Sequence, residues 1–139
     1  MKTILVGFDE SAESLRAAEQ ATDLCKRTGA RLLFATAVPL PTAEGPLLPE
    51  FSESDGRLRQ SARAKLERAR RHALEAGVDA AVVSTEGLAP DVLAQLAEQA
   101  NADLVVIGHR HRSALLRAVL GSTADRLLQI SPRPVMVVR

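Results

Sequence analysis

The stretch Asp103-Leu104-Val105-Val106-Ile107-Gly108 places a continuous aliphatic run between a carboxylate and a glycine. A short apolar run of this kind predicts a strand that is buried on both faces. Four other segments also predict strands: Ile4–Phe8, Arg31–Val38, Val78–Thr85 and Val135–Val138. Because most of these runs are continuously apolar, they favour a parallel sheet that is covered on both sides.

Helical patterns lie between the predicted strands. One begins at Ser11 and is closed by Gly29, and the others span Arg57–Ala76, Pro90–Ala100 and Ala114–Ile130, the last interrupted by Gly121. The segment Pro39–Gly56 contains several prolines and predicts a long surface loop. The alternation of strands and helices predicts an α/β fold in which helices flank both faces of the sheet, formed by a single domain of 139 residues.

The composition excludes several classes of protein. Aromatic residues make up 2% of the chain and Cys25 is the single cysteine, so the core is expected to be aliphatic and a disulfide framework is excluded. No segment is long and apolar enough for a membrane span, and we expect a cytoplasmic protein. The net charge is +1, and the basic face within 57–71 is interpreted as a solvated helix surface, which makes nucleic acid an improbable partner.

The segment after Gly108 is a candidate anion site. It is rich in basic and hydrogen-bonding side chains, namely His109, Arg110, His111, Arg112, Ser113 and Arg117, and Gly121-Ser122-Thr123 then restarts a helix. Glycine lets a backbone approach an anion, and the free amides of a helix N-terminus favour a phosphate. The structural alternative is that Gly108 ends a strand, Gly121 kinks a helix and Ser122 caps it.

Metal binding and covalent catalysis find little support in the residues. His109 and His111 are too few for a metal site, because no cysteine or acid lies within the same loop. Neither Ser113 nor Ser122 stands in a recognisable nucleophile motif. We therefore assign no catalytic residue and no metal ligand.

A family resemblance rests on four stretches that follow in order. Gly108, two residues, His111, nine residues and Gly121-Ser122 resemble the ATP-binding signature of the universal stress protein family, in which a second glycine stands where this chain has His111. The segments 4–11, 102–108 and 133–138 also resemble that family. The resemblance covers essentially the whole chain. At position 111, an imidazole either donates to a phosphate, beside Arg110, or blocks the cradle.

The resemblance implies roles for particular residues. Asp9 would face the ribose or a metal bound to the phosphates, with a turn role as the equal alternative, and Gly7 and Phe8 would line the same pocket. Val38 would meet adenine through its backbone, and Ile107 would pack near the base or ribose. Phosphates would be held by backbone amides and hydroxyls of Gly108, Gly121, Ser122 and Thr123.

The resemblance also implies an architecture and a function. The fold would be an open five-stranded parallel sheet, Rossmann-like, in the order 3-2-1-4-5, with a homodimer paired through the edge strand Val135–Val138. The function would be that of an ATP-binding stress regulator or adaptor, with Mg²⁺ as a candidate companion of ATP, rather than a fast enzyme. The alternatives are a dimeric adaptor that binds no ATP because of His111, and a slow ATP hydrolase.

Overall fold

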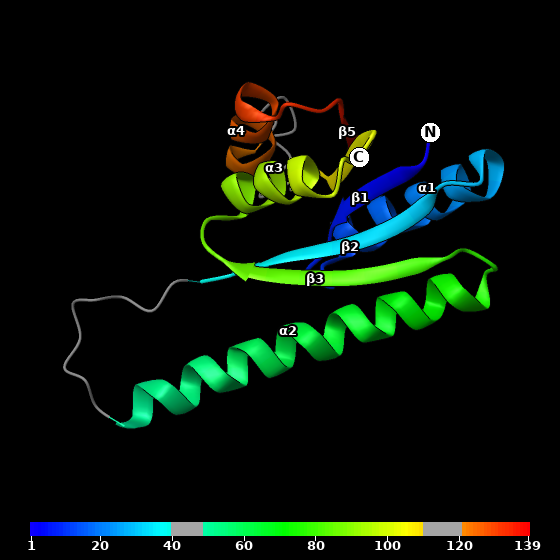
Figure 1. The fold of residues 1–139 in the computed structure, drawn as a ribbon. Coiled ribbons are helices and arrows are strands. Elements are labelled where there is room, and N and C mark those ends of the chain that lie inside the picture. The colour runs from blue at the N-terminus through cyan, green and yellow to red at the C-terminus, as the bar shows by residue number, and fades with distance from the viewer. Residues whose placement is uncertain (40–48, 110–120) are drawn as a thin grey trace.

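A single parallel sheet forms the centre of the molecule (Figure 1). The computed structural model describes residues 1–39, 49–109 and 121–139, with only the backbone of residues 49–55. The strands are β1 (Thr3–Gly7), β2 (Arg31–Val38), β3 (Ala80–Glu86), β4 (Leu104–Gly108) and β5 (Val135–Val138). Their order is β3-β2-β1-β4-β5, and every neighbouring pair is parallel. The predicted fold class and strand order are therefore confirmed.

The helices cover both faces of the sheet (Figure 1). Side chains of α1 (Ala12–Thr28) and α2 (Pro49–Glu75) share one buried cluster with one face of the strands. Side chains of α3 (Ala89–Gln99) and α4 (Ser122–Ile130) share a second cluster with the other face. The core is aliphatic apart from Phe8 and Phe34, whose rings meet edge to face at 5.6 Å.

The ends of α1 follow from local chemistry. Ser11 is the N-cap, and its hydroxyl accepts a hydrogen bond from the Ser14 amide at 3.2 Å. Gly29 closes the helix with a φ of 76°, a left-handed conformation that glycine adopts without a steric penalty. The buried face of α1 includes Cys25, and burial raises the pKa of its thiol to about 11. A thiol with this pKa is inert at neutral pH, as expected for a structural cysteine.

The predicted boundaries of the second helix and of the third strand were wrong. Residues 49–56 were expected to belong to a loop, but α2 begins at Pro49, because proline is favourable in the first turn of a helix. Gly56 lies inside this helix rather than before it. The third strand begins at Ala80 instead of Val78 and extends to Glu86. Of the helix expected over 114–130, residues 114–120 lie outside the described part of the chain, and α4 begins at Ser122.

Within 1–39, 49–109 and 121–139, no helix combines the length and the apolar character that crossing a membrane requires.

Candidate functional site

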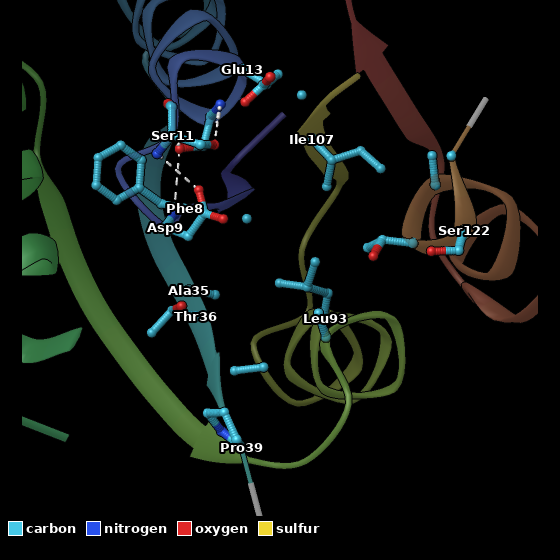
Figure 2. A pocket seen from close by; sticks show the side chains of 18 residues that line it. Phe8, Asp9, Ser11, Glu13, Ala35, Thr36, Pro39, Leu93, Ile107 and Ser122 are labelled. Carbon is cyan, nitrogen blue, oxygen red and sulfur yellow. Dashed lines mark hydrogen bonds between the residues drawn. The ribbon is translucent and has the colours of Figure 1, made fainter. Parts of the chain in front are cut away.

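A cavity of about 730 Å³ opens at the carboxyl ends of the central strands (Figure 2). This is the edge at which open α/β sheets bind ligands, next to the point where the strand order reverses between β1 and β4. The volume lies within the range of small-molecule sites. The described residues that line it are Gly7, Phe8, Asp9, Ser11, Glu13, Ser14, Ala35, Thr36, Ala37, Pro39, Ala89, Leu93, Ile107, Gly108 and Gly121–Ala124.

The turn between β1 and α1 forms one wall of the cavity. The Asp9 carboxylate accepts a hydrogen bond from the Ser11 amide at 3.0 Å, and the Asp9 amide donates to the Ser14 hydroxyl at 3.3 Å. The Ser14 hydroxyl in turn donates to the Ser11 carbonyl oxygen at 3.0 Å. Figure 2 shows these bonds as a compact network beside the cavity. Asp9 therefore fills the turn role, and its exposed side chain also borders the cavity.

An ion pair joins this turn to α2. The Arg68 guanidinium donates to both carboxylate oxygens of Glu10, at 2.7 and 2.9 Å. These hydrogen bonds hold the pKa of the Glu10 carboxyl below its ordinary value of 4.5, and the charge of Lys65 acts in the same direction. Glu10 is therefore ionised at neutral pH.

The end of β2 forms a second wall. Because Gly7 at the end of β1 is paired with Ala35, the residues Thr36–Val38 extend past β1 alongside β3. Thr36, Ala37 and Pro39 line the cavity. Val38 does not: its side chain is buried, and its carbonyl oxygen accepts a hydrogen bond from the Gly87 amide at 3.0 Å. The prediction named Val38, the last residue of β2, whereas its neighbours Thr36, Ala37 and Pro39 are the residues that line the cavity.

Gly108 is required by packing inside the protein. A Cβ at this position would overlap the Glu13 carbonyl group and would lie 2.7 Å from Glu13 Cβ, so α1 passes directly over the end of β4. A Cβ at Gly7 would lie 3.0 Å from Leu93 Cδ1 and 3.2 Å from Ile107 Cγ2. Both glycines border the cavity, and at both positions the packing of neighbouring residues disfavours a larger side chain, whether or not a ligand binds.

The N-terminus of α4 forms the wall opposite the Asp9 turn (Figure 2). Gly121 is the N-cap and makes no side-chain capping bond, and the exposed residues Ser122 and Thr123 follow it. The first amides of a helix have no acceptor within the helix, and the helix dipole adds partial positive charge there. This wall therefore offers amides and two hydroxyls to an anion.

The structure brings most of the predicted site residues to one cavity. Those that line it are Gly7, Phe8, Asp9, Ile107, Gly108, Gly121, Ser122 and Thr123, whereas Arg110 and His111 lie outside the described residues. Sequence reasoning missed Glu13, Leu93 and the β2 residues. The position of a helix residue over a distant glycine has no local sequence signal, so only the packing of α1 on β4 reveals Glu13.

The described part of the chain gives no candidate metal centre. No group of three or more His, Cys, Asp and Glu side chains within it is arranged to hold a metal ion. The titratable residues among the described cavity lining are Asp9 and Glu13.

Comparison with known proteins agrees with this fold. Residues 1–139 match the sequence profile of the universal stress protein family. The chain belongs to the universal stress protein family. A universal stress protein of Thermus aquaticus is 34% identical over 99% of this chain and 98% of its own length. A universal stress protein of Synechocystis sp. is 32% identical over 99% of this chain and 85% of its own length.

Several similar solved structures contain adenine nucleotides, among them the following two. A universal stress protein in complex with cAMP has 28% identity and a TM-score of 0.76, over 99% of this chain and 97% of that one. A family protein from Arabidopsis thaliana with AMP bound has 18% identity and a TM-score of 0.74, over 99% of this chain and 91% of that one. The second likeness concerns the fold alone.

Proposed function

We propose that this universal stress protein binds ATP and acts as a stress-response regulator, by changing its conformation or its partners when the nucleotide binds. One observation carries the proposal. Gly121, Ser122 and Thr123 at the start of α4 form a wall of the cavity that faces the Asp9 turn. A related protein of 28% identity has been solved with cAMP, which supports an adenine nucleotide as the ligand class.

The walls of the cavity suit the different parts of a nucleotide. The small residues Ala35, Ala37 and Ala89 leave room for a flat base beside the β2 backbone. The Asp9 carboxylate borders the cavity where a ribose hydroxyl would find an acceptor. The Ser122 and Thr123 amides and hydroxyls would receive the phosphates. His111 and Arg110 remain candidates for further phosphate contacts.

A divalent cation fits the charges of this arrangement. Asp9 and Glu13 both line the cavity, and two carboxylates oppose a polyphosphate. We expect Mg²⁺ to accompany ATP, because its charge offsets this repulsion and its preferred ligands are carboxylate and phosphate oxygens.

The hydrogen-bonding network around Asp9 favours binding over fast turnover. Asp9 already accepts the Ser11 amide and orders the turn, which leaves it poorly placed to move protons during a reaction. We therefore propose a binding protein, with conformational change as its output.

Calorimetric titration of ATP with Mg²⁺ tests this proposal. Replacing both hydroxyls, Ser122→Ala with Thr123→Ala, is expected to weaken ATP binding by roughly tenfold or more, because hydrogen bonds to charged groups are the strong ones. Ser61→Ala is the matched control, since Ser61 is an exposed hydroxyl on α2 outside the cavity lining.

Two results would replace the proposal. An absence of heat and of thermal stabilisation up to ~1 mM ATP would indicate a nucleotide-free adaptor. ATP consumption over many turnovers that is lost in Asp9→Ala would indicate a slow hydrolase.

We further propose a homodimer paired through β5. This strand is the last in the order of the sheet and consists of Val135-Met136-Val137-Val138. An apolar edge strand presents unpaired backbone groups to other chains, and pairing with a second copy removes that hazard.

A further inference from the structure

Glu10 has an unfavourable backbone conformation at the rim of the cavity. Its φ is 69°, in the left-handed region that side chains other than glycine, asparagine and aspartate seldom adopt. Glu10 stands between Asp9, which borders the cavity, and Ser11, which caps α1. Such a conformation costs free energy, and interactions with the surrounding structure must offset that cost.

The compensation comes from α2, which is distant in sequence. Arg68 holds both oxygens of the Glu10 carboxylate in a two-pronged hydrogen-bonded pair, the geometry for which guanidinium is suited. The Arg68 side chain is 54% exposed and that of Glu10 is 34% exposed, so the pair is partly screened by solvent. The pair connects the turn after β1 to α2 through two hydrogen bonds.

Arg68 also changes the charge at this rim. Asp9, Glu10 and Glu13 are three carboxylates within five residues of the chain, and Asp9 and Glu13 line the cavity that an anionic ligand would enter. Arg68 neutralises Glu10, with Lys65 adding positive charge nearby. Arg68 can therefore affect the cavity in two separate ways, by holding the Glu10 side chain in place and by neutralising its charge.

We propose that Arg68 is a positioning residue of the nucleotide site, acting through Glu10 to hold the Asp9 turn in its binding conformation. The inference rests on the proposed nucleotide binding and adds α2 to the elements that control it. Arg68 does not line the cavity, so its effect passes through the Glu10 carboxylate and the turn backbone.

Two variants separate geometry from charge. Arg68→Lys keeps the positive charge but lacks the planar fork, so the proposal predicts binding of Mg²⁺–ATP and AMP that is roughly threefold to fivefold weaker. Glu10→Gly removes a negative charge and relieves the left-handed φ, so charge alone would strengthen binding, whereas the proposal predicts a similar weakening. Arg71→Ala, an exposed cation one turn further along α2, is the control and is expected to remain within about twofold of the parent chain.

Thermal unfolding of the same variants excludes loss of the fold. Glu10→Gly is expected to unfold at or above the temperature of the parent chain because its backbone strain is gone. Weaker binding by a protein of undiminished stability is a result that a purely structural role cannot give. Parent-like or tighter binding by Glu10→Gly and Arg68→Lys would overturn the proposal.

A measurement without nucleotide keeps the two proposals distinguishable. Backbone NMR order parameters of Asp9, Glu10 and Ser11 are expected to fall from about 0.85 to below about 0.6 in Arg68→Ala and to stay unchanged in Arg71→Ala. If the parent chain binds no adenine nucleotide, the proposed function fails, and these order parameters still show whether Arg68 holds the turn. Unchanged order parameters in Arg68→Ala would overturn the inference by themselves.

Discussion

Gly108 has two explanations, one that involves binding a phosphate and one that involves packing inside the protein. Its place after an apolar strand and before a basic segment predicts a phosphate-binding glycine. The structure adds a reason inside the protein, because the Glu13 carbonyl of α1 occupies the space that a Cβ would need. The two residues are far apart in sequence, so this contact could not be foreseen from the residues around Gly108.

The substitution Gly108→Ala tests the internal reason. We expect it to lower the free energy of unfolding of the nucleotide-free protein by about 1–3 kcal/mol, because backbone must shift to admit the methyl group. Urea denaturation measures the change. Gly56→Ala is the matched control: it lies in open space within α2 and is expected to raise stability by about 0.5–1 kcal/mol. Equal effects of the two variants would show that Gly108 is not confined by α1.

At the level of elements, β1 and β4 are joined at their starts as well as along their length. Asp103 accepts the Thr3 amide at 2.9 Å and the Lys2 amide at 2.7 Å. These backbone hydrogen bonds hold the pKa of Asp103 below its ordinary value of 3.8. The interaction aligns the central pair of strands whose other ends border the cavity.

The lowered pKa predicts the pH range in which Asp103 stabilises the fold. A carboxyl with a lower pKa in the folded state stabilises it fully above the unfolded value and loses this effect as the pH falls through the folded value. Asp103→Ala is therefore expected to unfold at a lower urea concentration than the parent chain at pH 7. The gap between the two midpoints should close as the pH falls below 3.8. A gap that stays constant down to pH 2 would contradict this account.

Strands and the ends of α1 could be predicted from the sequence because local signals specify them. The apolar runs, the Ser11 cap and the Gly29 terminus need no knowledge of distant residues. The start of α2 was missed because Pro49 fits both a proline-rich loop and the first turn of a helix. The strand order came from the family resemblance, and Thr36 and Ala37 were missed because the register between β1 and β2 is a property of the assembled sheet.

Across the whole molecule, the candidate site draws on both ends of the chain. The Asp9 turn lies near the N-terminus, and the start of α4 lies in the last fifth of the sequence. The C-terminal strand β5 pairs with β4, which also ends at the cavity. A dimer formed through β5 would therefore bring the two copies together one strand away from each site.

The variant Val137→Pro tests this dimer. The Pro134 carbonyl accepts a hydrogen bond from the Val105 amide of β4, and the Val138 carbonyl accepts one from the His109 amide just after β4. Because backbone groups alternate along a strand, the Val137 amide points away from β4. Proline removes that amide and leaves the pairing with β4 intact. We expect Val137→Pro to sediment as a monomer at micromolar concentration, while Val137→Thr, which keeps the amide, stays dimeric. A monomeric parent chain would refute the dimer.

The parallel pairing of the sheet has a consequence for how the molecule assembles. In the centre of the sheet Ile4 is paired with Leu104, so the chain must close a loop of 100 residues before β1 and β4 meet. Closing such non-local contacts slows folding, since the entropy of the loop is lost before the contacts form. The residues that line the cavity come from both strands of this pair, so a ligand of the cavity would bind only chains in which β1 and β4 have already met.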